Sequence, residues 1–339
     1  MGEATTALIV IGRNEGERLE RCLRSIGVGR PVIYVDSGST DDSVVLAERL
    51  GATVVRLDPA QTFTAARARN AGLARLAEDG IRVDHVQMID GDCELQPGWI
   101  ERAVAAMEAD PALAVVFGRR RERFPDRSIY NWLCNVEWAI PPGPAGSCGG
   151  DALFRHKAIA AAGGYRPEMI AGEEPDLCAR LRRAGWEIVC LDAEMTLHDA
   201  AITRFGQWWR RTARAGHAFA ELTALHGKLR EGRPYRAARR RIVMWGLLPV
   251  LGLLLAAAIG LAGQASDARM IALAILLLLA AQTLRLTLRE GLRFPMAKAF
   301  ALASFLTIGK FAEATGLIRY LWEQASGRRA TLIEYKNAA

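Results

Sequence analysis

Short apolar runs alternate with helix-like segments through the first hundred residues, and this alternation constrains the fold more than any other feature of the chain. Each run has the length of a buried parallel strand, and each intervening segment carries apolar residues at helical spacing. The joints between them are short, which is typical of a parallel α/β sheet. The expected strands are residues 7–11, 32–35, 52–57 and 86–89.

Acidic and amide side chains stand directly after three of these strands. Ligands of such sheets bind beyond the carboxyl ends of the strands, so these side chains are expected to converge. The stretch 86–92 is the most informative, because it stops at two aspartates separated by a glycine. Carboxylates spaced in this way suit a divalent cation that bridges a diphosphate, and a solvated Asp-Gly turn is the alternative. The side chains concerned are Asn14, Glu15, Asp36, Asp90 and Asp92.

The α/β pattern continues to about residue 200. A helix is expected up to residue 109, followed by a strand over 114–117 and a last strand over 186–191. Between them, residues 173–176 open a further helix, because Pro175 and a cluster of acidic residues are typical of a first helical turn.

The composition changes at Ile242. Residues 242–263 carry no charge and are about long enough to cross a bilayer, where Pro249 is tolerable. A second apolar run covers residues 270–284, so the two are predicted to form a transmembrane hairpin. A buried helical hairpin of a soluble protein is the alternative.

Basic residues flank the predicted hairpin on both sides, which by the positive-inside rule places both flanks in the cytoplasm. Residues 294–322 mix aromatic and charged side chains and are predicted to form an interfacial helix. The predicted parts are a catalytic domain over 1–230, a basic juxtamembrane segment over 231–241, two transmembrane helices within 242–290, and an amphipathic interfacial helix with a C-terminal tail over 291–339.

The charge balance narrows the class of partner. The chain has 44 Lys and Arg against 37 Asp and Glu, a net charge of +7, which suits an acidic membrane surface or a phosphate-bearing ligand. No nucleic-acid-binding motif is present, so nucleic acid is not an expected partner. The six cysteines are scattered and form no CxxC pair, which predicts reduced, buried thiols in a cytoplasmic compartment.

An ordered set of motifs resembles family 2 glycosyltransferases of the GT-A fold, in particular their membrane-anchored bacterial type. The set begins with residues 9–42 and continues through 68–72, 90–92, 149–155 and 173–177, covering about two thirds of the chain. The resemblance implies an α/β, Rossmann-like mixed sheet of the nucleotide-diphospho-sugar transferase class. It also implies a nucleotide-diphosphate sugar donor, Mg²⁺ or Mn²⁺ as cofactor, and inversion of the anomeric centre.

The resemblance assigns roles on the donor side. Asp92 is expected to hold the metal with Asp90 beside it, and His198, after the last strand, is expected to complete the site. A structural histidine is the alternative for His198, and a turn or N-cap residue is the alternative for Asp36. The expected nucleotide-sugar contacts are Asn14, Glu15, Asp36, Ser37, Gly38, Asp90 and one of the phosphate-binding candidates Arg67 and Arg69.

Inversion requires a base that takes the proton of the acceptor hydroxyl. Glu173 and Glu174 stand where the family has a Glu-Asp pair, so Glu174 is the leading candidate. Glu173 and Asp176 are the alternatives, and acidic residues also favour a helix start for electrostatic reasons alone.

Two segments are candidates for contact with the acceptor or the diphosphate. One is the glycine-opened stretch that begins with Gly149, Gly150 and Asp151. The other resembles, with its order scrambled, the Gln-x-x-Arg-Trp motif of membrane synthases in this family. Its residues either grip a diphosphate or seat a helix at the lipid interface, and ordinary helix packing is the third reading. They are Gln207, Trp208, Trp209, Arg210 and Arg211.

The sequence as a whole predicts an inverting hexosyltransferase at the inner membrane that faces the cytoplasm. The predicted acceptor is a hydroxyl of a lipid-linked molecule, first a polyprenyl-diphosphate saccharide in surface polysaccharide assembly, then a polyprenyl phosphate or a glycolipid. A non-catalytic membrane scaffold that retains the nucleotide pocket is an alternative, and a nucleotidyltransferase that releases pyrophosphate is another. The sugar, the nucleotide base and the oligomeric state stay open at this point.

Overall fold

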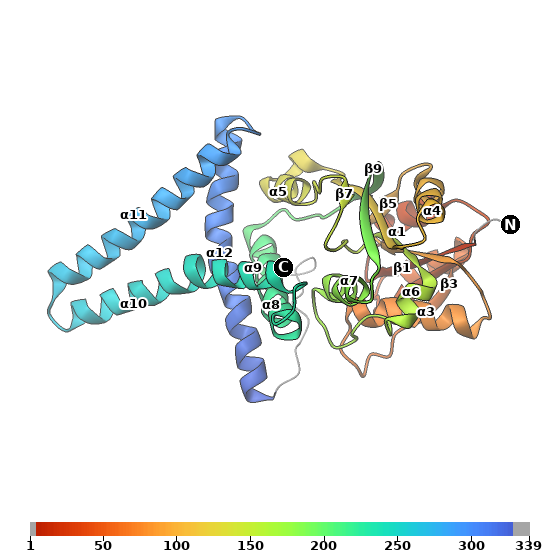
Figure 1. The fold of residues 1–339 in the computed structure, drawn as a ribbon, viewed down its shortest axis with the longest axis horizontal. Coiled ribbons are helices and arrows are strands. Elements are labelled where there is room, and N and C mark those ends of the chain that lie inside the picture. The colour runs from red at the N-terminus through yellow and green to blue at the C-terminus, as the bar shows by residue number, and fades with distance from the viewer. Residues whose placement is uncertain (1–4, 328–339) are drawn as a thin grey trace. The chain divides into compact units, whose positions relative to one another are not determined.

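The computed structural model describes residues 5–327 and divides them into two compact units, one ending at Arg204 and one beginning at Phe205 (Figure 1). The predicted catalytic domain, residues 1–230, therefore includes a helix that the structure groups with the second unit.

The first unit is built on a mixed sheet with the strand order β3-β2-β1-β4-β8-β6-β9-β5, and β7 pairs with β9. The strands that the structure describes are β1 (Thr6–Gly12), β2 (Val32–Asp36), β3 (Thr53–Arg56), β4 (His85–Asp90), β5 (Cys93–Leu95), β6 (Leu113–Glu122), β7 (Gly143–Pro144), β8 (Ala152–Arg155) and β9 (Glu187–His198).

The first four strands run parallel, so their carboxyl ends lie at one edge of the sheet. The register pairs Gly12 with Asp36 and Ile11 with Asp90, which brings the tips of β1, β2 and β4 level. Strand β8 runs antiparallel to both β4 and β6, while β9 runs parallel to β6 and extends to His198. The mixed sheet delivers β9 to the same region as β4, because β5 after β4 pairs with the end of β9.

Helices cover the sheet, so the central strands are buried and their sequences are continuously apolar. Residues Ala7, Leu8, Ile9 and Val10 of β1 are completely buried. The helix after β1 buries a single stripe at helical spacing, Leu19, Cys22, Leu23 and Ile26. The helices of this unit are α1 (Glu17–Ile26), α2 (Ser43–Arg49), α3 (Ala65–Glu78), α4 (Trp99–Ala109), η1 (Pro125–Arg127), α5 (Ile129–Glu137), α6 (His156–Ala161) and α7 (Glu173–Arg183).

The second unit is helical, and its central feature is a hairpin of two long apolar helices, α10 and α11 (Figure 1). Its elements are α8 (Phe205–His226), α9 (Arg233–Ile242), the π-helical turn η2 (Val243–Leu247), α10 (Leu248–Leu261), α11 (Ala265–Glu290) and α12 (Met296–Ser326). Helix α9 continues through η2 into α10 as a single rod from Arg233 to Leu261.

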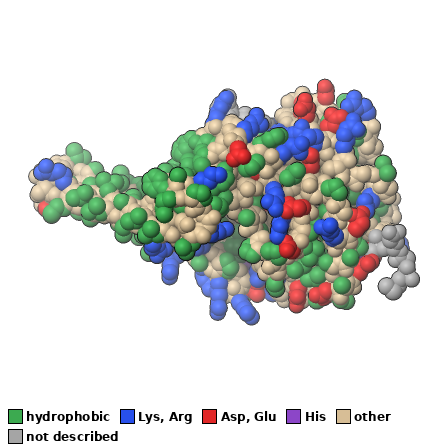
Figure 2. Space-filling view, turned by 90° about the horizontal axis from the view of Figure 1, so that it is seen from above, with side chains coloured by type: hydrophobic (Ala, Val, Ile, Leu, Met, Phe, Trp, Pro, Cys, Tyr) green, Lys and Arg blue, Asp and Glu red, His purple; other side chains and the backbone are tan. Residues whose placement is uncertain are grey.

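Among the residues that the structure describes, three helices of this unit are long and apolar enough to cross a membrane: Arg233–Leu261, Ala265–Glu290 and Met296–Ser326. The side chains of the hairpin are mostly hydrophobic and exposed, as the green surface in Figure 2 illustrates. The two helices predicted to span a bilayer are thus present. Helix α12, predicted to be interfacial, also reaches spanning length, so its interfacial position stays a prediction.

Three glycines set the packing inside the second unit. An added Cβ on Gly216 of α8 would lie 2.0 Å from the carbonyl oxygen of Glu313, and one on Gly316 of α12 would lie 1.8 Å from that of Ala213. Gly246 in η2 approaches the Lys310 carbonyl oxygen in the same way. Helix α12 therefore crosses α8 and η2 with backbone against backbone.

The structure confirms the α/β fold class and adds two features that the sequence did not indicate. Strand β5 is only three residues long, and β9 continues beyond the predicted residue 191 as far as His198. All six cysteines are free and buried, as predicted.

Candidate active site

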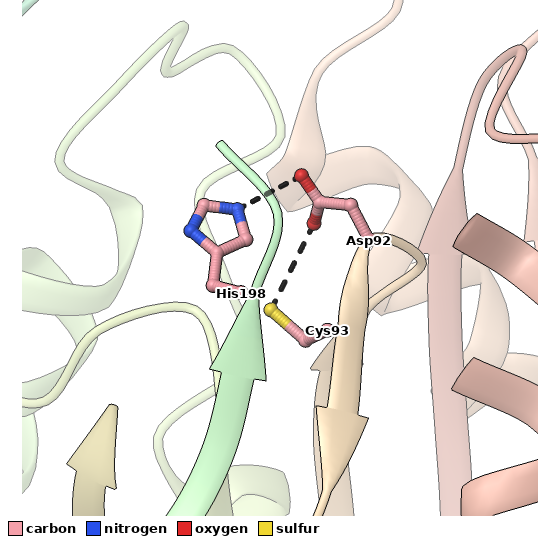
Figure 3. A group of neighbouring side chains, drawn as sticks. All are labelled: Asp92, Cys93 and His198. Atoms are coloured by element: carbon pink, nitrogen blue, oxygen red, sulfur yellow. Dashed lines mark hydrogen bonds and ion pairs between the residues drawn. The ribbon is translucent and has the colours of Figure 1, made fainter. Parts of the chain in front are cut away.

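A buried carboxylate and imidazole meet where β4 leads into β5 and where β9 ends (Figure 3). The Oδ2 atom of Asp92 lies 2.8 Å from Nε2 of His198, and both side chains are almost fully buried. The antiparallel register pairs Cys93 with His198, which explains how residues so far apart in the sequence become neighbours. The other ring nitrogen of His198, Nδ1, is buried and has no hydrogen-bond partner among the described residues.

This pair fits a divalent cation. Adjacent ligands at about 2.1 Å from an octahedral metal lie about 3 Å apart, close to the observed separation of the two side-chain atoms. The Cys93 thiol also lies close to Asp92, with Sγ 3.8 Å from Oδ1. Burial and the carboxylates of Asp151 and Asp92 raise the pKa of Cys93 well above its ordinary value, so it stays a neutral thiol and leaves oxygen and nitrogen as the donors.

A second cluster surrounds Arg69, a guanidinium that is only 2% exposed. Its Nη2 lies 3.0 Å from Asp90, and its Nη1 lies 2.9 Å from Glu173 and 3.0 Å from Glu174. The ring of Tyr165 stacks on the guanidinium at 5.5 Å. Burial alone would lower the pKa of Arg69, but the three carboxylates raise it, so the group stays charged. Arg69, predicted as a phosphate contact, thus joins the tip of β4 to the start of α7.

Of the two glutamates that pair with Arg69, Glu174 is the more exposed: 14% of its side chain is accessible, against 4% for Glu173. Burial and the neighbouring charge of Glu173 raise the pKa of Glu174 to about 7, although Arg69 opposes the shift. A carboxylate with such a pKa can accept a proton at neutral pH. Asp176 differs, because it is fully buried and forms ion pairs with Arg166 and Arg180.

The glycine-opened stretch lies against the same carboxylate. A Cβ on Gly150 would fall 2.5 Å from Oδ2 of Asp90 and 2.8 Å from Nη2 of Arg69, so a larger residue there would displace one of these groups. Gly149 faces the guanidinium of Arg120. Asp151, predicted as an acceptor or diphosphate contact, is fully buried, accepts hydrogen bonds from the Asp90 amide and the Thr196 hydroxyl, and forms an ion pair with Arg120. It ties β4, β6 and β9 together behind the site.

The predicted nucleotide residues form a connected loop structure at the tips of β1 and β2. Asp36 accepts hydrogen bonds from the amides of Gly38 and Ser39 at 3.0 and 2.9 Å. The side chain of Asn14, whose φ is +54°, accepts one from the Thr40 amide at 2.7 Å. Ser37 donates its amide hydrogen to the Gly12 carbonyl oxygen. These contacts hold both loops together at the carboxyl edge of the sheet.

The two remaining donor-side candidates have local partners. Glu15 lies 3.0 Å from Arg18 and packs its Cγ beside Gly12 and Gly91. Arg67 donates to the backbone carbonyl oxygens of Asp58, Gln61 and Thr62, and so braces the loop before α3.

Comparison with known protein families identifies a match to the N-terminal part of the chain. A model of the family described as glycosyl transferase family 2 matches residues 7–158, the segment that contains the β1, β2 and β4 tips. This segment of the chain is therefore similar to glycosyl transferase family 2.

Individual relatives agree with this. The pre-mycofactocin glycosyltransferase of Mycobacterium tuberculosis is 27% identical over 234 residues, which are 65% of this chain and 47% of the relative. The chain therefore spans about half the length of the curated relatives that it matches first.

Solved structures share the fold. A mannosyltransferase from Pyrobaculum calidifontis, in complex with GDP-Man and Mn²⁺, has a TM-score of 0.59 at 18% identity and covers 96% of this chain and 89% of its own. S. aureus TarS has a TM-score of 0.52 at 13% identity over 90% of this chain and 92% of its own.

One residue of the candidate site, Arg120, was not predicted from the sequence. Arg120 lies 2.9 Å from Asp151 and 4.0 Å from Asp90, and it stacks on Trp138, whose ring lies 4.5 Å from that of His198. Its side chain is 14% exposed, whereas its neighbours Arg119 and Arg121 are 41% and 51% exposed. Alternation along β6 points the middle arginine of three toward the site, and that alternation was the available signal.

The scrambled motif Gln207 to Arg211 lies in the first turns of α8, in the second unit. Trp208 is buried and packs edge-on against Phe305 at 5.0 Å, while Phe205 contacts both Trp208 and Trp209. For the tryptophans, these contacts favour the packing role over the gripping of a diphosphate. Gln207 is buried as well, and Arg210 and Arg211 are half-buried.

Proposed function

We propose that this glycosyltransferase moves a sugar from a nucleoside-diphosphate donor to a hydroxyl group of a lipid-linked acceptor, with inversion at the anomeric carbon. The observation that carries the proposal is the Asp92–His198 pair at 2.8 Å, near the carboxyl edge where β1, β2 and β4 end. The neighbour in fold that carries GDP-Man and Mn²⁺ supports a donor of this class.

Asp92 and His198 would hold a divalent cation, and an imidazole nitrogen in the donor set favours Mn²⁺ over Mg²⁺. A bound cation would neutralise the charge that develops on the departing diphosphate. The loops after β1 and β2, which the hydrogen bonds of Asn14 and Asp36 hold in place, would bind the nucleotide.

Glu174 supplies the base. Its carboxylate accepts the proton of the acceptor hydroxyl while the oxygen attacks the anomeric carbon and the diphosphate departs. Arg69 keeps Glu174 beside Asp90, so the base is held next to the donor side of the site. The resemblance to inverting family members supports the stereochemical outcome.

The membrane supplies the acceptor. Three candidate spans and basic flanks on the hairpin support an inner-membrane enzyme whose flanks and catalytic unit face the cytoplasm. We propose a polyprenyl-diphosphate saccharide used in surface polysaccharide assembly as acceptor. A polyprenyl phosphate or a glycolipid is the alternative.

The test uses the purified full chain in detergent with a panel of labelled nucleotide sugars and lipid acceptors. Wild-type protein with Mn²⁺ is expected to transfer label into the lipid fraction, EDTA is expected to stop transfer, and added Mn²⁺ to restore it. Asp92→Asn and Glu174→Gln are expected to lower the rate by at least about 100-fold. Unchanged activity in both variants would end the assignment.

Two other classes give different readouts in this assay. A scaffold would bind a donor, detected as a raised melting temperature, without turnover in any combination. A nucleotidyltransferase would release pyrophosphate, which a coupled assay detects.

A further inference from the structure

Helix α9 carries five arginines within nine residues, and all five side chains are exposed. We call them the α9 arginine cluster. At 100° per residue, Arg233, Arg236 and Arg240 lie on the side of the helix opposite its buried residues, and Arg239 and Arg241 flank that side. The cluster consists of Arg233, Arg236, Arg239, Arg240 and Arg241.

Within the described part of the chain, no acidic side chain pairs with this cluster. Among residues 5–327, none of the five guanidinium groups forms an ion pair, and Arg236 makes one long hydrogen bond to the Leu229 carbonyl oxygen at 3.4 Å. Arg236 and Arg240 are four residues apart, a spacing at which like charges destabilise a helix. The cluster is thus suited to a partner that brings negative charge.

The position of the cluster identifies that partner. Helix α9 runs without a break through η2 into the apolar α10, and the rod from Arg233 to Leu261 is a candidate span. The arginines occupy the first nine residues of this rod, about 12 Å along its axis. With α10 in the hydrocarbon, this stretch lies at the depth of the lipid headgroups.

We propose that the α9 arginine cluster is a binding site for the phosphate groups of anionic phospholipids. Guanidinium groups bind phosphate oxygens through paired hydrogen bonds, and each arginine near an anionic surface strengthens binding about fivefold. The proposal rests on the candidate span and is independent of the transfer reaction.

The experiment measures which lipids stay bound to the full chain. Protein in micelles of neutral detergent, doped with equal amounts of phosphatidylglycerol and phosphatidylcholine, is analysed by native mass spectrometry. Wild-type protein is expected to retain phosphatidylglycerol at least about fivefold over phosphatidylcholine. The triple substitution R236Q/R239Q/R240Q keeps good helix formers and is expected to bring this ratio within twofold of one.

Matched variants separate charge position from charge number. R49Q/R102Q/R183Q removes three exposed arginines of the first unit that form no ion pair with any described residue, and it is expected to keep the wild-type ratio. R236K/R239K/R240K keeps the charge and is expected to retain most of the enrichment, which rules out misfolding as the cause of a loss.

Two outcomes overturn the proposal. One is an equal ratio in wild type and R236Q/R239Q/R240Q. The other is displacement of phosphatidylglycerol by millimolar inorganic phosphate, which would make the cluster a site for a free anion. Loss of the ratio at high salt supports the proposal, since screening weakens exposed charge pairs.

Discussion

At the scale of single residues, Glu174 carries the most direct prediction. Because burial and Glu173 raise its pKa to about 7, Glu174 is protonated below that pH and cannot act as a base. The transfer rate is therefore expected to rise as the pH is raised through about 7. Glu174→Gln is expected to remove at least about 99% of the rate while donor binding persists. Rate measurements between pH 5.5 and 8.5 check this.

The matched control is Glu187→Gln, which changes an exposed glutamate of β9 that forms no ion pair within residues 5–327. If Glu174→Gln kept full activity, or if its rate rose through the same pH range as that of the wild type, Glu174 would not be the base.

Arg69 gives a second residue-scale prediction. Replacing it with methionine leaves Asp90, Glu173 and Glu174 without their shared cation, which costs about 3–5 kcal/mol for a buried pair. We expect a melting temperature lowered by about 10 °C. Arg69 opposes the rise in the pKa of Glu174, so its removal is expected to raise that pKa further. Any remaining transfer rate is then expected to rise at a higher pH than in the wild type.

The control is Arg183→Met, which replaces an exposed arginine of α7. The melting temperature of this variant is expected to equal that of the wild type. Arg69→Met combined with Glu173→Gln should recover part of the lost stability, because one unpaired charge is gone. A further fall in the double variant would contradict the shared role of Arg69.

Much of the residue-scale site could be predicted because its side chains follow strand ends. Asp36 ends β2 and Asp92 lies two residues after the end of β4, so the alternation of elements predicted where both would lie. The roles of Arg69 and Arg120 were not readable. Arg69 is buried only because three carboxylates from two distant segments surround it. Alternation along β6 could single out Arg120 among its neighbours, but its place beside the site depends on the pairing of β6 with β9.

At the scale of elements, the segment before β8 can be tested with two glycines. Gly150→Ala places a methyl group 2.5 Å from Asp90 and is expected to displace Asp90 or Arg69. We expect donor affinity to fall at least about tenfold and stability to fall by about 1–3 kcal/mol. Gly146→Ala is the control, because nothing lies within 4 Å of its added Cβ. Thermal shift with donor and Mn²⁺ measures both effects, and equal behaviour of the two variants would refute the close approach.

At the crossing of α8 and α12, replacing glycine with alanine is expected to destabilise the protein, which is the opposite of its usual effect in a helix. Alanine normally stabilises a helix by about 1 kcal/mol relative to glycine. At Gly216 and Gly316 the new methyl group would meet a backbone carbonyl at 2.0 and 1.8 Å, so both substitutions are expected to destabilise the second unit. Gly206→Ala in α8 has space and should stabilise slightly or change nothing. Detergent melts followed by circular dichroism decide between them.

Elements with strong periodicity matched their predicted ranges, and short or paired ones did not. Strand β5 has three residues, too few to show a pattern, and it exists because it pairs with β9. The continuation of β9 to His198 likewise depends on its pairing with β5 and β6.

At the scale of the whole molecule, the topology prediction can be tested by labelling. Every cysteine is buried, so new cysteines at Ser266, Lys228 and Gln324 can be read against a low background. In intact bacterial cells, an impermeant thiol reagent is expected to label Ser266→Cys, at the hairpin tip, and not Lys228→Cys. Labelling of Lys228→Cys alone would invert the orientation. Labelling of Gln324→Cys would make α12 a third span, and protection would keep it at the interface.

Family and architecture were readable from the sequence at this scale, because the ordered motifs and the uncharged run occupy separate stretches of the chain. The position of α12 relative to a bilayer was not, since its five charged residues are partly offset by internal pairs such as Lys310 with Glu313 and Arg319 with Glu323.

The glycine crossings at Gly216, Gly246 and Gly316 also affect how the second unit responds to lipid. Contacts made by backbone leave no room for one helix to slide along another, so the depth of α12 is coupled to that of the rod from Arg233 to Leu261. In a thinner or thicker bilayer these helices must tilt together rather than adjust one by one.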